Sequence, residues 1–292
     1  MKLGRKYKLL VELENGKAIE IVNPISCQFD IQRNAAASLN NGTFRVYNLS
    51  PTNRNQLFQP RVNAARVGGV FKRVVFQGGY DNLTTCFVGN VLEAYSYRQG
   101  VDIITVISCQ DGGYGAYTSK ISTTIEAGTS FTDSLKALFG SMDNTETGAI
   151  GNLEGSHKKP TSLFGSSFYL LKKNFGDGFF IDLNKMNYLK DNEYIKNKGG
   201  VVPRINSQTG LLGTPILQGT IIIVNMLFEP RINVASLVDI ESSINPQYNG
   251  QFKVLGVAHS GIISEAQSAT ATTTLQLQAA DLLTGELMGI DS

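Results

Sequence analysis

Two histidines are the side chains in this sequence best suited to acid–base chemistry or metal binding. His259 lies in the stretch Gly256–Gly261, and His157 lies far earlier in the chain. A catalytic base or a metal ligand needs partners, but the sequence has no HExxH motif, no paired histidines and no CxxC motif. We therefore expect His259 to be a hydrogen-bonded residue at the end of a strand.

Two pairs of carboxylates have the residue types that a glycosidase or a peptidoglycan lysozyme uses. Glu12 with Glu14, and Asp239 with Glu241, are each two positions apart, which places each pair on one face of a strand. Such stripes are usually solvated, and the chain has no tryptophan to form a sugar platform. We expect no catalytic residue at these positions.

Two loops begin like ligand-binding motifs and then depart from them. The glycine-rich stretch Asp111–Gly115 lacks the GK[ST] of a P-loop and the third glycine of a dinucleotide site. Asp182–Met186 begins like a calcium loop but has methionine where a ligand should come. The sequence thus predicts no metal site and no cofactor, and a turn between domains at residues 111–115.

The three cysteines, Cys27, Cys86 and Cys109, lie singly in strand-like stretches without metal-ligand spacing. A disulfide or a nucleophile is the functional alternative for them. Their isolation favours small buried side chains in a reducing compartment.

Length and charge limit the class of protein. The 292 residues suffice for two or three compact modules, and only 17% of them are charged. The net charge of +2 comes without a basic run, so we expect no sequence-specific nucleic-acid binding. No apolar run reaches membrane-spanning length, and Glu12 interrupts any signal-peptide core, so we expect synthesis in the cytoplasm. The low charge fits either a surface covered by partners or an ordinary β protein.

Short β-patterned runs separated by turns fill residues 1–113. Tyr7–Leu13 and Ala18–Val22 are predicted to form a hairpin around Asn15-Gly16. Cys27–Gln32 alternates, so Cys27, Phe29 and Ile31 share one face. The stretch Asn41–Gly113 continues as antiparallel strands, with a turn at Ser50-Pro51 and a helical turn after it. We expect this meander to close a small barrel.

The pattern changes after Gly113. Residues 130–140 predict an amphipathic helix capped by Ser130, and residues 166–175 predict a second helix that buries Phe168, Leu171 and Phe175. Residues 141–159 are polar and are predicted to form a mobile loop, whereas residues 179–189 predict a short hairpin. Residues 114–204 are therefore expected to form a small α+β domain, and β patterning resumes over residues 205–292.

The order and spacing of these motifs resemble the baseplate hub proteins of contractile-tailed bacteriophages and related contractile injection systems. In the first part of the chain the matching motifs are Val46–Ser50, Gly79-Tyr80, Phe87–Val91 and Asp102–Gly112. In the last part they are Thr209–Pro215, Leu227–Val234, Val238–Ser242 and Asn249–Gly261. Together the two sets of motifs cover most of the chain.

The resemblance implies a mainly β fold, with two tail-tube-like β-barrel domains at 1–113 and 205–292 and the α+β domain between them. It implies a non-enzymatic structural protein of the virion, in the tail baseplate, assembled in the host bacterial cytoplasm. Its partners would be two further copies in a homotrimer, the central spike protein, the tail tube protein and other baseplate proteins. The ring would adapt the six-fold tube to the three-fold spike and nucleate tail assembly.

Two alternatives remain open at this point. A tail-associated peptidoglycan hydrolase would need a carboxylate, cysteine or zinc site in a pocket. A receptor-binding β-module would need exposed aromatic platforms, whereas most aromatic residues here alternate into predicted strand cores.

Overall fold

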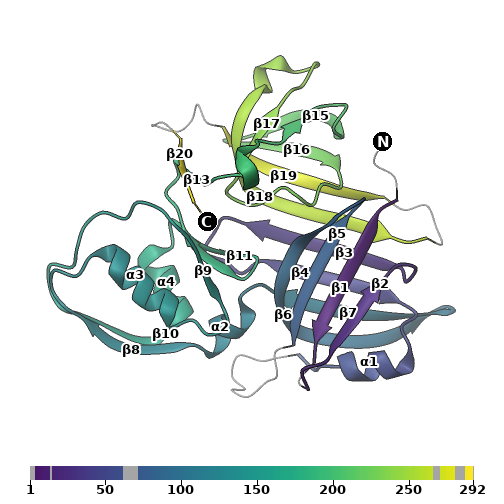
Figure 1. Ribbon diagram of the computed structural model, residues 1–292, viewed down its shortest axis with the longest axis horizontal. Coiled ribbons are helices and arrows are strands. Elements are labelled where there is room, and N and C mark those ends of the chain that lie inside the picture. The colour runs from purple at the N-terminus through teal and green to yellow at the C-terminus, as the bar shows by residue number, and fades with distance from the viewer. Residues whose placement is uncertain (1–3, 14, 62–71, 266–269, 280–286, 292) are drawn as a thin grey trace.

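The computed structural model describes residues 4–13, 15–61, 72–265, 270–279 and 287–291, and β-strands dominate it (Figure 1). The mainly β fold predicted from the sequence is confirmed. One large sheet carries the first and last parts of the chain, and the helical part lies to one side of it.

The N-terminal hairpin forms as predicted. Strand β1 (Lys6–Glu12) pairs antiparallel with β2 (Ala18–Val22), and alternate residues along both strands are buried. Leu9, Val11 and Ile21 face the core because successive side chains of a strand point to opposite faces.

The first part of the sheet continues with a compact meander. Its elements are β3 (Cys27–Asn34), β4 (Asn41–Tyr47), α1 (Pro51–Leu57), β5 (Arg73–Gly79), β6 (Leu83–Gln99) and β7 (Asp102–Gln110). The helical turn predicted at Asn53–Phe58 is present, but α1 begins two residues earlier, at Pro51, because Ser50 Oγ caps it by accepting a hydrogen bond from the Asn53 N–H at 3.3 Å. Cys27, Phe29 and Ile31 are buried on one face of β3, as predicted.

The middle part contains the expected helices and several short strands. Its elements are α2 (Gly113–Thr118), β8 (Lys120–Ile125), α3 (Phe131–Gly140), β9 (Glu146–Ile150), β10 (Thr161–Ser166), α4 (Ser167–Phe175), β11 (Phe179–Asp182), β12 (Lys185–Tyr188) and β13 (Glu193–Ile195). Ser130 caps α3 by accepting from the Asp133 N–H at 3.0 Å. The predicted hairpin is β11 with β12.

Two predictions for this part are wrong in detail. The expected mobile loop at 141–159 contains β9, which pairs in parallel with β12 and is held by the Ala149 N–H on Asn187 Oδ1 at 2.9 Å. Helix α4 buries Leu170 and Leu171, whereas Phe168 and Phe175 are only partly buried. Phe168 and Phe175 still pack against the cluster that Leu170 and Leu171 form with α3.

The last part returns to the large sheet. Its strands are β14 (Arg204–Ile205), β15 (Leu211–Gln218), β16 (Ile221–Leu227), β17 (Leu237–Ile240), β18 (Gly250–Ile263), β19 (Ala271–Ala279) and β20 (Met288–Ile290). Strand β20 pairs in parallel with β13, so the end of the described chain lies against the middle part.

The sheet is continuous across the first and last parts. Its order is β15-β16-β19-β18-β3-β4-β7-β6-β5-β1-β2, with β14 and β17 branching from β18. Strands β18 and β3 pair antiparallel from Gly256 with Asn34 to Ile263 with Cys27. The expected closed barrels are not seen among the described residues, because this path has two ends, at β15 and β2.

Five strands in the first part and five in the last part share one order. The first unit runs β3-β4-β7-β6-β5 and the second runs β15-β16-β19-β18-β17, with every neighbour antiparallel. Both units turn at a proline after their second strand, at Pro51 and at Pro230. The two segments therefore share one strand order. Outside these five strands the units differ, because β1 pairs antiparallel with β5 whereas β14 pairs parallel with β17.

A β-bulge falls at the same place in both units. The fourth strand of the first unit shifts register at Leu92, between Val91 and Glu93, and that of the second shifts at Leu255, between Val254 and Gly256. The dipeptide Val-Leu thus marks the bulge in β6 and in β18.

Candidate functional site

His259 is fully buried between the two units. Its Nδ1 hydrogen-bonds to Thr273 Oγ1 at 2.9 Å, and its ring lies edge-on to Phe228 at 5.4 Å. Burial, reinforced by the nearby charge of Arg33, lowers the pKa of His259 to about 3, so the ring is neutral at physiological pH. The residue lies within β18 and not at the strand end that the sequence predicts, because β18 extends to Ile263.

His157 lies far from His259, in the middle part of the chain. Its Nε2 is 2.8 Å from Ser134 Oγ, and its Nδ1 is 3.2 Å from Thr161 Oγ1. A serine nucleophile needs a free path to substrate, but Ser134 is buried in α3 and also donates to the Ser130 carbonyl at 3.2 Å. The contact fastens the segment before β10 to helix α3.

The carboxylates singled out in the sequence lie in surface ion pairs. Glu12 accepts from Arg73 Nη1 at 2.9 Å, and Asp239 accepts from Arg204 Nε at 3.2 Å. Arg204 also lies 3.9 Å from Glu241, and Glu14 lies outside the described residues. Within the described ranges no three His, Cys, Asp or Glu side chains are placed to share a metal ion.

The stretch Asp182–Met186, which begins like a calcium loop, instead supplies one side of a buried ion pair. Arg33 on β3 donates from Nε to Asp182 Oδ1 at 2.7 Å and from Nη2 to Asp182 Oδ2 at 2.6 Å. Nη2 also donates to Asn233 Oδ1 at 3.1 Å, and Asn40 Nδ2 donates to the Ile181 carbonyl at 2.8 Å. All three parts of the chain therefore meet at one guanidinium.

Asp111 lies beside this pair and is buried as well. Its Oδ1 accepts from the Asn184 N–H at 2.8 Å, and its own N–H donates to the Asn40 carbonyl at 2.9 Å. Burial, together with the charge of Asp182, raises the pKa of Asp111 to about 8. The turn predicted at residues 111–115 is present, but α2 begins within it at Gly113.

The sequence offers no local signal for Arg33, the residue that joins these parts. It alternates into the buried face of β3, where an arginine is unusual unless paired. The strand predicted at Cys27–Gln32 ends one residue before Arg33, and the observed strand continues to Asn34. Continuing the alternation by one residue places Arg33 on the buried face, and Asp182 at the end of another strand is its partner.

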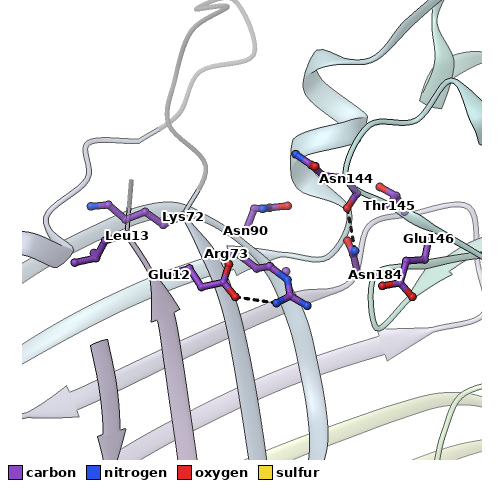
Figure 2. Close-up of a pocket in the computed structure, with 10 residues that line it drawn as sticks. Glu12, Leu13, Lys72, Arg73, Asn90, Asn144, Thr145, Glu146 and Asn184 are labelled. Atoms are coloured by element: carbon purple, nitrogen blue, oxygen red, sulfur yellow. Dashed lines mark hydrogen bonds and ion pairs between the residues drawn. The ribbon is translucent and has the colours of Figure 1, made fainter. Parts of the chain in front are cut away.

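A polar pocket of about 510 Å³ lies between the first part of the large sheet and the middle part of the chain (Figure 2). Glu12 of β1 and Arg73 of β5 form an ion pair on one side of it, and Lys72 and Glu146 also line it. Asn144 lies opposite and is hydrogen-bonded to Asn184. A larger pocket of about 740 Å³ lies against Arg231, which donates to Glu229 from Nε at 2.7 Å. The charges that line the first pocket balance, whereas cationic side chains outnumber Glu229 around the second.

The three cysteines are free and buried, which confirms the prediction. Burial raises the pKa of each thiol, and that of Cys86 reaches about 12. Neutral buried thiols are poor nucleophiles.

Large apolar side chains are exposed on two strands of the sheet. On β6 they are Leu83, Tyr95 and Tyr97, and on β15 they are Leu212, Ile216 and Leu217. Monomeric proteins seldom leave such side chains together on a sheet edge without a partner. None of the helices in the described ranges is long and apolar enough to cross a membrane.

Solved structures with the same fold come from tail proteins. The tail protein from Neisseria meningitidis MC58 matches with a TM-score of 0.63 at 9% identity, over 98% of this chain and 100% of that chain. The prophage MuSo2 43 kDa tail protein from Shewanella oneidensis matches at 0.61 and 8%, over 98% and 100%. The E. coli c3393 protein, a component of the type VI secretion system, matches at 0.57 and 6%, over 87% and 74%.

Sequence comparison gives the family. No curated protein matches the chain significantly. The model of the baseplate hub gp41 family matches residues 8–260, which is most of the chain and includes the first five-strand unit and the second unit as far as β18. The resemblance found in the sequence motifs is thus confirmed, and the chain belongs to the baseplate hub gp41 family.

Proposed function

We propose that this protein is a hub subunit of a phage contractile tail, and that three copies form a ring around the tail axis. The ring adapts the six-fold tail tube to the three-fold central spike and nucleates tail assembly. One observation carries the proposal: each chain holds two units of the same strand order, so three chains supply six similar units.

The three parts of the chain have different proposed roles in the ring. Residues 1–113 and 205–292 form the two tube-like domains of the ring. Residues 114–204 form the α+β domain, whose helices lie to one side of the sheet (Figure 1). In the proposed ring they lie on the outside. The tail tube, the spike and other baseplate proteins are the partners, and assembly takes place in the host cytoplasm.

Exposed apolar strands and a low charge support a surface that partners cover. Of the 292 residues only 17% are charged. The type VI secretion component c3393, whose fold is similar, is described as similar to the T4 bacteriophage tail proteins gp27 and gp5. That likeness supports a place in the tail for this fold.

Light scattering on the purified full-length chain, alone and with the spike protein of the same phage, tests the proposal. We expect a mass of three chains, either alone or once the spike is added. A monomer whose mass the spike leaves unchanged contradicts the hub function.

A further inference from the structure

The junction of β18 with β3 joins the second unit of the chain to the first. Eight antiparallel pairs hold it, and it buries His259 opposite Ile31. Each unit has one strand equivalent to β18 and one strand equivalent to β3. The junction uses β18 of the second unit and β3 of the first, so the other two equivalent strands of the chain are not used in it. The inference below rests on the proposed function and concerns these two unused strands.

Strand β6 is the equivalent of β18. Counted from the Val-Leu bulge, Ser96 in β6 occupies the place of His259 in β18. Both bond to a threonine of the next strand: Ser96 Oγ is 3.0 Å from Thr105 Oγ1, and His259 Nδ1 is 2.9 Å from Thr273 Oγ1. The two strands therefore match residue by residue beyond the bulge.

Strand β15 is the equivalent of β3. The matching positions, in order across the sheet, are Ile31, Gly42 and Cys109 in the first unit and Leu217, Ile222 and Leu277 in the second. Cys109 and Leu277 each lie opposite the bulge valine of their own unit. Leu217 thus takes the place that Ile31 has in the junction.

The unused strands are exposed where their equivalents are buried. His259 and Ile31 are 0% exposed, whereas Leu217 is 48% exposed and Ser96 is exposed as well. Residues 95–99 of β6 are exposed on both faces, and β7 is the only strand paired with them among the described residues. On that outer edge the described pairing ends at Ala94, which bonds to Gln59.

We propose that the outer edge of β6 pairs antiparallel with β15 of a second copy, repeating the junction of β18 with β3 between chains. The register carries over from that junction: Ser96 lies opposite Leu217 of the partner subunit, and Tyr97 lies opposite Ile216 of the partner subunit. Each copy offers one β6 edge and one β15 edge. The contact is therefore head-to-tail, and such a contact forms a ring when the rotation between neighbouring copies closes, as the proposed trimer requires.

Paired cysteines test this register. Directly opposite residues of antiparallel strands have Cα atoms about 4.5–5.5 Å apart, within the range of a disulfide. We expect the full-length double variant Tyr97→Cys with Ile216→Cys to form covalent dimers and trimers on mild oxidation, seen on a non-reducing gel. The three native cysteines are buried and stay free.

The matched control is Tyr97→Cys with Gln218→Cys, which moves one cysteine two residues along β15. In the proposed register these positions are diagonal, about 7–8 Å apart, and cross-link poorly. Cross-linking of the control in place of the first pair would mean a different register and would overturn the inference.

A single substitution gives a second readout. Leu217→Asp replaces an exposed side chain, so the chain folds, but it places a charge in the proposed junction. We expect loss of the trimer in light scattering, with Phe164→Asp, on the 81% exposed Phe164 of β10, leaving it intact. A trimer that survives Leu217→Asp and lacks the 97–216 disulfide overturns the inference and leaves the hub function standing. A wild-type monomer, with or without the spike protein, contradicts both.

Discussion

The residue that most constrains this molecule is Arg33, a charged side chain at a core position. Its bidentate pair with Asp182 joins β3 to β11, and Asn233 adds a contact from the last part of the chain. A buried pair of this kind stabilises little relative to apolar side chains, but removing one partner leaves an uncompensated charge. The pair therefore fixes how the parts fit together.

Replacing Arg33 tests this directly. Arg33→Met leaves Asp182 without its guanidinium, and we expect a loss of about 3–5 kcal/mol in the free energy of unfolding. Urea denaturation followed by circular dichroism measures it. Arg73→Met is the control, because its ion pair with Glu12 is exposed and should contribute at most about 1 kcal/mol. Equal losses in the two variants would contradict the prediction.

Asp111 makes stability depend on pH. Its folded pKa is raised from 3.8 to about 8, so the folded state holds this proton more tightly than the unfolded chain does. The resulting stabilisation is complete below pH 3.8 and is lost as the pH rises toward 8, by up to about 1.4 kcal/mol per pH unit.

Asp111→Asn removes this titration and keeps the Oδ1 acceptor. We expect the melting temperature of the variant, relative to wild type, to rise steadily from pH 5 to about pH 8. Thermal melts across that range measure it, with the exposed Asp30→Asn as control. A difference that stays constant with pH would rule out this role for Asp111.

At the scale of elements, the close contact of the two units depends on one glycine. A Cβ added at Gly78 of β5 would lie 2.6 Å from Cζ of Phe228, the residue that follows β16. Phe228 also packs against Phe29 and His259, so it has little room to move. The missing side chain at Gly78 lets the second unit approach the first.

Gly78→Ala should overpack this contact and lower the free energy of unfolding by about 1–3 kcal/mol. Adding Phe228→Leu should recover part of that loss, and a double-mutant cycle by urea denaturation measures the coupling. Gly140→Ala at the end of α3 is the control, because nothing lies within 4 Å of an added Cβ there. Additive effects at positions 78 and 228 would show that the ring and the glycine are not in contact.

Local patterns predicted the elements better than their partners. The hairpin of β1 with β2, the alternation of β3 and the cap of α3 follow from turn residues, period and capping chemistry that lie within a few positions. The pairing of β18 with β3 joins strands far apart in sequence, and no local pattern records it. Strand β9 was missed for a similar reason. It lies in a polar stretch and forms a strand because it pairs with β12. Of the candidate functional regions, only the sequence motifs could be predicted. The exposed strands β6 and β15 could not, because their free edges are known only once the order of strands in the sheet is known.

At the scale of the whole molecule, one prediction concerns hydrolysis. Among the described residues, Glu12 and Asp239 are bound to arginines at the surface, and the thiols are buried. We expect purified protein to give no clearing on a peptidoglycan zymogram, with lysozyme as the positive control. Clearing that is lost on Glu12→Ala or Asp239→Ala would reverse this conclusion.

The antiparallel junction of β18 with β3 affects how the assembly of the ring depends on protein concentration. Because both strands belong to one chain, that junction forms at the effective concentration of a tethered pair and does not depend on protein concentration. In a ring of three two-unit chains, three of the six junctions are therefore complete before any chains meet. Only the other three require collisions, so dilution opens the ring at alternate positions and releases intact two-unit chains.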